Sequence, residues 1–201
     1  MDLATLFLFI LTFGSILVLP GPNSAFAVGQ SLKFGVISSL VVPLGFMSAT
    51  GLHAIFIFSG IGLVIQEYSL ALSILKWLGV LYLLWLAYKS FISKPLTIVV
   101  SPKEISKLKM YFSAMFLSLT NPKALLASLI VYPLFLSAEY VYTEQAVILS
   151  FSAMAISFSV YSLYSLAALA LKNRLASSKL ANQIVGSMYL GAASVLAAKS
   201  T

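Results

Sequence analysis

Six long, nearly uncharged apolar runs dominate this chain of 201 residues. A helix needs about 20 apolar residues to cross a hydrocarbon layer of about 30 Å, and each run is close to or above that length. Only 8% of the residues are charged, against about 25% in an ordinary soluble domain. Because open strands cannot span lipid, the sequence predicts an all-α integral membrane protein with about six transmembrane helices. The runs are Leu3 to Leu32, Phe34 to Gln66, Ser69 to Ile92, Met110 to Ala138, Gln145 to Leu171 and Leu180 to Ala198.

Charged residues alternate in sign from one connection to the next. The basic set is Lys33, Lys89, Lys94, Lys103, Lys107, Lys109, Lys172, Arg174 and Lys179, and the acidic set is Asp2, Glu67, Glu139 and Glu144. Cytoplasmic loops are enriched in Lys and Arg, so both termini are expected outside. The net charge of +7 then reflects topology and not a nucleic-acid surface. Five spans with one re-entrant run is the alternative, because the first run is overlong and contains helix breakers.

The first run also has a feature of a secretory signal. Ala25-Phe26-Ala27 follows apolar residues, as a cleavage site would. No Lys or Arg precedes the run, so the basic segment that a signal peptide needs is missing. We expect the run to be retained as a span.

The two halves of the chain share short motifs in corresponding places. Pro20-Gly21-Pro22-Asn23 interrupts the first run, and Thr120-Asn121-Pro122-Lys123 interrupts the fourth. The last run of each half carries Gly-x-x-Tyr, ending at Tyr82 and Tyr189. With three spans in each half, the repeats would have opposite orientations. We expect a single domain over 1–201, with repeat 1 over about 1–92, a cytoplasmic basic loop over about 93–109 and repeat 2 over about 110–201. The alternative to the repeat is that these short matches arise by chance.

The two Pro motifs predict broken helices. Proline lacks an N–H and clashes with the carbonyl one turn earlier, but it suits the first position of a new half-helix. Pro22 and Pro122 would occupy that position, with Gly21 and Asn121 near the caps. The new N-termini offer N–H donors and partial positive charge to a carboxylate, and the freed carbonyls suit an ammonium group. Two facing breaks would hold a small zwitterion; the alternative is that each Pro only kinks its helix.

At these motifs the sequence resembles the LysE/RhtB family of amino-acid exporters. The resemblance rests on Pro20-Gly21-Pro22-Asn23 and Asn121-Pro122-Lys123, and it covers nearly the whole chain. Supporting positions are Gly35, Gly45, His53, Lys76-Trp77-Leu78-Gly79, Tyr82-Leu83, Pro133, Gly186 and Gly191. The resemblance implies a transporter in the cytoplasmic (inner) membrane of a prokaryote. It would export a small amino acid or derivative, with protons as the coupling ion.

One departure from the family pattern affects the expected mechanism. Family members commonly carry Gly-Asp in the middle of the second span, and here those positions are Ala49 and Thr50. An acid inside the membrane is costly unless it is functional. Its absence leaves the net charge of the substrate and the coupling mechanism open.

Several polar residues within the runs are candidates for function. Lys123 would bind the substrate carboxylate or else stabilise carbonyls of the opposite half-helix. His53 would carry a proton or link helices, and Thr50, one turn earlier, offers it a hydrogen-bond partner. The expected substrate-binding set is Pro22, Asn23, Ser24, Asn121, Pro122, Lys123, Tyr82 and Tyr189, and the proton-coupling candidates are His53 and Thr50.

Other function classes fit the composition poorly. The chain has one His and no Cys, so we expect no catalytic triad, no metal site and no cofactor. The expected partners are a small zwitterionic substrate, protons and membrane lipid, with no nucleic acid and with a homodimer left open. The alternative to a transporter is a membrane scaffold or assembly subunit, which would need no polar site at paired breaks.

Overall fold

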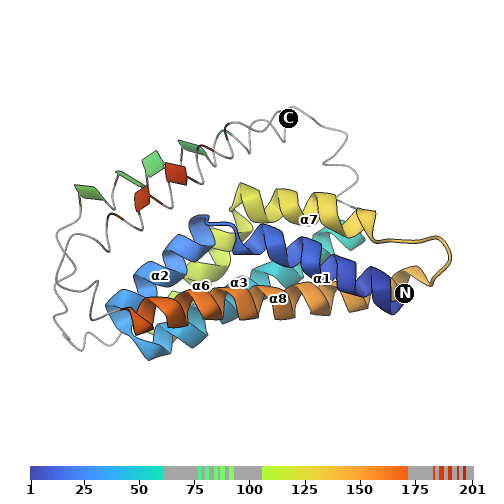
Figure 1. Ribbon diagram of the computed structural model, residues 1–201, viewed down its shortest axis with the longest axis horizontal. Coiled ribbons are helices and arrows are strands. Elements are labelled where there is room, and N and C mark those ends of the chain that lie inside the picture. Colours follow the sequence, from blue (N-terminus) through green and yellow to red (C-terminus); the bar gives the residue numbers. More distant parts are fainter. Residues whose placement is uncertain are drawn as a thin grey trace.

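Every continuous element that the structure describes is a helix. The computed structural model describes residues 1–60 and 106–171, and single helical positions at 77, 80, 81, 84, 85, 87, 88, 91, 92, 183, 186, 187, 190, 191, 194 and 197. The all-α prediction is confirmed for these residues. The helices are α1 (Leu3–Val18), α2 (Pro22–Phe34), α3 (Val36–Phe58), α6 (Lys107–Leu119), α7 (Pro122–Leu134) and α8 (Tyr142–Ala170) (Figure 1).

Four of the expected spans correspond to these helices. α3 and α8 are each long and apolar enough to cross a membrane. α1 with α2, and α6 with α7, pass the same test as pairs, bent by 63° and 60° at their junctions. The protein is therefore a multi-pass membrane protein. The expected spans at 69–92 and 180–198 fall outside the continuously described ranges.

Contacts between α3 and its neighbours fix the directions of three helices. α3 packs against α8 in the opposite direction, since Phe46 contacts Tyr161 and the other end of α3, at Phe58, contacts Tyr142. α3 and α6 run the same way, because the Tyr111 hydroxyl donates to Ser48 Oγ at 2.6 Å and, further along both helices, His53 of α3 lies beside Leu119 at the end of α6.

The two bent pairs run in opposite directions past each other. Phe9, early in α1, stacks on Tyr132, late in α7, with ring centroids 5.9 Å apart, and Lys123, at the start of α7, contacts Leu19, just after α1. From their junctions, α2 continues towards one end of the bundle and α7 towards the other (Figure 1). The junctions therefore lie side by side between the two ends.

The charged residues separate between these ends. Lys33, Lys107 and Lys109 lie where α2 ends and α6 begins, which we call the basic end, on the left in Figure 1. Asp2 and Glu139 lie where α1 begins and α7 ends, which we call the acidic end. Asp2 caps α1 by accepting the Thr5 N–H at 2.8 Å, and this bond lowers the pKa of the Asp2 carboxyl.

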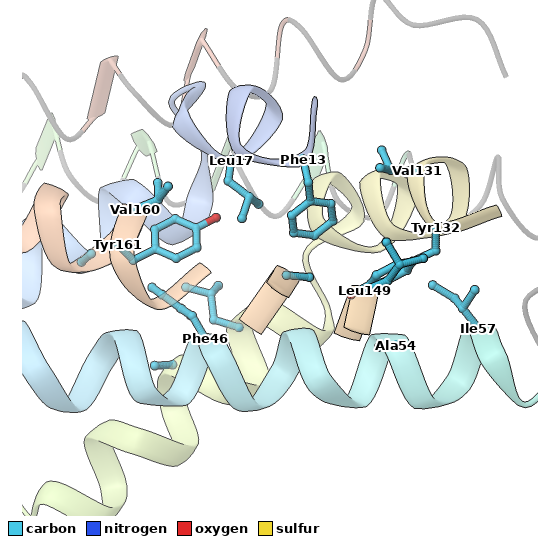
Figure 2. Close-up of a cluster of buried hydrophobic side chains, with 14 of the residues drawn as sticks. Phe13, Leu17, Phe46, Ala54, Ile57, Val131, Tyr132, Leu149, Val160 and Tyr161 are labelled. Atoms are coloured by element: carbon cyan, nitrogen blue, oxygen red, sulfur yellow. The ribbon is translucent and has the colours of Figure 1, made fainter. Parts of the chain in front are cut away.

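An aromatic cluster fills the bundle between the junctions and the acidic end. Phe9, Phe13 and Tyr132 are buried and lie against Phe58. Figure 2 shows Phe13, Tyr132 and Leu149 in this region, between α1, α7 and α8. Such packed rings leave little room for water.

Candidate functional site

The α1–α2 junction has the local structure that its sequence predicts. Pro22 is the first residue of α2 and Gly21 is its N-cap. The hydroxyl of Ser24 accepts the Gly21 N–H at 2.8 Å and donates to the Gly21 carbonyl at 2.9 Å. The N–H groups of Asn23 and Ser24 have no carbonyl acceptor within α2, as at any helix start.

The α6–α7 junction has a similar construction. Pro122 is the first residue of α7, and Asn121 is its N-cap. Asn121 Oδ1 accepts the Lys123 N–H at 3.1 Å, which is the bond expected of an Asn cap. The Thr120 hydroxyl donates to the Phe116 carbonyl at 2.9 Å, so it stabilises the last turn of α6.

A direct hydrogen bond joins the two junctions. Asn121 Nδ2 donates to Asn23 Oδ1 at 2.9 Å, and Asn23 Nδ2 donates to Ser118 Oγ at 2.9 Å. The side chains of Asn23 and Asn121 are only 2% and 3% exposed. The structure thus brings together Pro22, Asn23, Ser24, Asn121 and Pro122, which the sequence placed in one site, around a buried pair of amides.

Side chains from other segments bond the carbonyls at the junctions. The Lys123 ammonium donates to the Leu19 carbonyl, and the Tyr164 hydroxyl donates to the Val18 carbonyl at 2.5 Å. Gly21 leaves room for Lys123, because a Cβ there would lie 3.2 Å from Lys123 Cδ. This contact agrees with the structural role expected for Lys123, and its role in binding a carboxylate stays a prediction.

His53 and Thr50 occupy neighbouring positions but do not bond to each other. His53 is 3% exposed, and its Nε2 lies 3.4 Å from the Leu119 carbonyl oxygen at the end of α6. The Thr50 hydroxyl donates to the Phe46 carbonyl and to Ser157 Oγ, both at 3.0 Å. The expected Thr50–His53 pairing is wrong, because a helical Thr readily bonds the carbonyl four residues back.

Three residues of the site were missed by the sequence reasoning. Ser118 bonds Asn23, Tyr161 lies beside Asn23, and Tyr164 lies beside Ser24. Tyr161 and Tyr164 share a face of α8 at a spacing of three residues, which was the available signal, but no repeat motif marked them. Tyr82 and Tyr189, which the repeat did mark, lie outside the described residues.

The electrostatic character of the junctions is positive. α2 and α7 both begin there, so both direct the partial positive charge of a helix N-terminus at the Asn23–Asn121 pair. Lys123 adds a full charge. Within the described part of the chain, the acidic side chains of Asp2, Glu139 and Glu144 lie near the acidic end, away from the junctions. The arrangement is suited to an anionic group.

Comparison with known proteins gives similar chains of nearly equal length. An uncharacterized membrane protein of Vibrio cholerae is 26% identical over 201 residues, covering 98% of each chain. A homoserine/homoserine lactone efflux protein of Salmonella typhimurium is 24% identical over 199 residues, covering 95% of each. A leucine efflux protein of an Enterobacter species is 29% identical over 197 residues, covering 90% of each. No solved structure matches the chain significantly.

A family model also matches most of the chain. The model of the LysE type translocator matches residues 14–200, a range that includes both junctions and the Asn23–Asn121 pair. The resemblance indicated by the Pro motifs is therefore confirmed, and the chain belongs to the LysE type translocator family.

Proposed function

We propose that this protein exports a small amino acid, or a close derivative, across the cytoplasmic membrane of a prokaryote. The observation that carries the proposal is the Asn121–Asn23 hydrogen bond of 2.9 Å, which joins two half-helix starts at a buried site. Family membership and the efflux proteins among its relatives support it. A scaffold would have no use for paired amides and a cation at two helix breaks.

The substrate carboxylate binds at the starts of α2 and α7. The carboxylate oxygens accept hydrogen bonds from the first-turn N–H groups of Asn23 and Ser24, from the side-chain amide of Asn121 and from the ammonium of Lys123. Helix N-termini favour anions, and a charged donor strengthens the hydrogen bond to a carboxylate. Four donor groups on two half-helices thus recognise one end of the substrate.

The substrate ammonium binds the carbonyls at the end of α1. In the structure, Lys123 and Tyr164 donate to the carbonyls of Leu19 and Val18. When substrate binds, Lys123 turns from Leu19 to the carboxylate, and the substrate ammonium takes its place. This exchange leaves neither the carbonyls at the end of α1 nor the Lys123 charge without a partner, which the membrane interior requires.

Transport follows from two inverted halves that share this site. The bent pairs α1–α2 and α6–α7 run in opposite directions, as the halves of an inverted repeat would. Rocking of one half against the other exposes a central site to each side in turn. The junctions move relative to each other in that step, so the Asn23–Asn121 bond breaks and forms again.

Protons are exchanged for substrate through His53. Its Nε2 lies 3.4 Å from the Leu119 carbonyl, so a protonated His53 would place a second positive charge beside the site. That charge repels a substrate ammonium and attracts the carboxylate at the start of α7. Exchange requires the repulsion to outweigh the attraction, so that proton and substrate exclude each other. The open alternative is a linking role, in which His53 only joins α3 to the end of α6.

Efflux from vesicles tests the function. Purified protein is reconstituted into vesicles loaded with labelled leucine, homoserine or other amino acids, with and without a pH gradient. Export of at least one amino acid, faster with protons supplied from outside, is expected. Protein-free vesicles and the Asn121→Ala variant are the controls. If no amino acid moves, the substrate class is wrong and the scaffold gains support; if export ignores the pH gradient, proton exchange is wrong.

A further inference from the structure

Buried polar side chains line the contact between α2 and α8 on the basic side of the junctions. Ser24 and Ser31 lie two turns apart on the same face of α2. Tyr164 of α8 lies beside Ser24, and Tyr161 lies beside Asn23. Ser165 follows Tyr161 by one turn towards the basic end. The helix registers thus place Ser31 and Ser165 in the seam between the two helices, beyond the substrate site.

The hydroxyl groups of this seam are unusual because they have no partner. Ser31 and Ser165 are both 0% exposed, and the hydroxyls of Ser31, Ser165 and the neighbouring Ser162 accept or donate no hydrogen bond within the described chain. Buried hydroxyls are nearly always bonded, to protein or to water.

Other serines at the same end show that a local bond is available. Ser38 Oγ donates to the Gly35 carbonyl at 2.6 Å, and Ser39 Oγ donates to the Val36 carbonyl at 2.6 Å. In α8 itself, Ser150 Oγ donates to the Ala146 carbonyl at 2.6 Å. Within the described residues Ser31 and Ser165 make no such bond, so their hydroxyls keep the capacity to bond water or a polar molecule that reaches them.

The opposite side of the junctions has a different lining. There the buried row of α8 continues as Leu149, which packs in the cluster that contains Phe9, Phe13 and Tyr132. Tyr132 carries a buried hydroxyl without a partner, but it is enclosed by aromatic rings at centroid distances of 5.0 to 5.9 Å. Rings pack on the basic side as well, where Phe46 contacts Phe26 and Tyr161. The basic side therefore differs by the hydroxyls of Ser31 and Ser165, and the acidic side is closed by rings alone.

We propose that the α2–α8 seam opens as a hydrated path by which the substrate reaches the Asn23–Asn121 pair from the basic end, while the aromatic cluster closes the other side. Water and the zwitterionic substrate supply the partners that Ser31 and Ser165 lack. This inference rests on the proposed function for the nature of the substrate. Because both serines are 0% exposed, the seam is closed in this structure and opens as substrate enters from the basic end.

Single cysteines test the path without a background signal, because the natural chain contains no Cys. Ser31→Cys and Ser165→Cys are near-isosteric, and either one alone suffices if the other fails to fold. Leu149→Cys is the matched control in the aromatic cluster. Each variant is reconstituted in vesicles and treated with a membrane-impermeant, cationic methanethiosulfonate, added separately to each side. Buried thiols in apolar surroundings are inert, so the reaction rate reports water.

We expect both seam cysteines to react from the side that holds the basic end, at least about tenfold faster than Leu149→Cys, because a thiol must be hydrated to form the reactive thiolate. Saturating amino-acid substrate should slow the reaction. Rates equal to that of Leu149→Cys, in protein that still exports, would show that the serines are small packing residues and overturn the path alone. Reactive seam cysteines in protein that moves no amino acid would support the path and contradict the proposed function.

Discussion

Lys123 donates to the Leu19 carbonyl, which the substrate ammonium must bind in the proposed function. This bond ties α7 to the end of α1, and the proposed exchange requires it to break. We expect Lys123→Met to weaken amino-acid binding at least about tenfold, because hydrogen bonds to charged groups contribute about 1.5–3 kcal/mol. Substrate-dependent protection against thermal unfolding in detergent, followed by vesicle efflux, measures both binding and transport.

The matched variant is Lys123→Arg, which keeps the charge and should retain most of the binding. Lys123→Met is expected to fold, since Met fills the space beside Gly21 and membrane helices tolerate a lost polar bond at about 0.6 kcal/mol on average. Normal export by Lys123→Met would make the ammonium a spectator. Failure of Lys123→Met to fold would make it a strut, and in either case the carboxylate assignment is wrong.

Local residue chemistry was predictable, and long-range partners were not. The sequence predicted Pro22 and Pro122 at helix starts and Asn121 at a cap, because these roles depend on neighbouring backbone atoms alone. The bond from Lys123 to Leu19 spans 104 residues. Two outcomes for Lys123 had to stay open, since a choice between them depends on how the helices pack. Tyr164 was missed for the same reason.

At the scale of helices, the contact between α3 and α6 depends on one glycine. A Cβ at Gly45 would lie 2.5 Å from the Tyr111 carbonyl oxygen and 2.9 Å from Ala114 Cβ, and backbone atoms cannot move aside as a flexible side chain can. We expect Gly45→Ala to reduce the free energy of unfolding by about 1–3 kcal/mol, the usual effect of overpacking. Thermal or denaturant unfolding in detergent measures the change.

Gly29 provides the matched control within α2. A Cβ there would have no heavy atom within 4 Å, and Ala is a better helix former than Gly by about 0.8–1.0 kcal/mol. Gly29→Ala should therefore leave the stability unchanged or raise it. Equal effects of the two substitutions would mean that α3 and α6 do not approach as closely as the structure has them.

The helix breaks could be predicted at this scale, but their geometry could not. The motifs at Pro22 and Pro122 predicted interruptions in the first and fourth runs, and the bends of 63° and 60° confirm them. Proline fixes where a helix stops and starts, whereas the angle follows from packing against α3 and α8. The bond from Asn23 to Ser118 could not be predicted either. It depends on how far α2 and α6 are shifted along each other, and the spacing of apolar residues in the sequence does not reveal that shift.

At the scale of the whole molecule, the apolar runs indicate a membrane protein, and the charged residues distinguish the two ends of the helix bundle. Lys33 and Lys107 gather at one end and Asp2 and Glu139 at the other, as the alternating loops predicted. Successive loops lie on opposite sides of the membrane wherever each helix begins and ends. The predicted separation of charges therefore does not depend on exact helix boundaries. The inverted repeat needs in addition the spans at 69–92 and 180–198, which contain Tyr82 and Tyr189, and it stays a prediction.

Orientation in the membrane is the remaining property that charge should control. Lys-rich ends stay in the cytoplasm because positive loops are retained there during insertion, whereas acids have little influence. We therefore expect a cysteine in place of Lys33 to lie inside the cell and one in place of Glu139 to lie outside. Both positions are exposed, and the chain has no other thiol. In intact cells an impermeant maleimide should label Glu139→Cys, and it should label Lys33→Cys only in inverted vesicles. Labelling of both from one side would contradict the separation of the basic and acidic ends by helices that cross the membrane. The reversed pattern would keep the crossing of the membrane but place the basic end on the outer face, which would contradict the orientation expected from the positive loops.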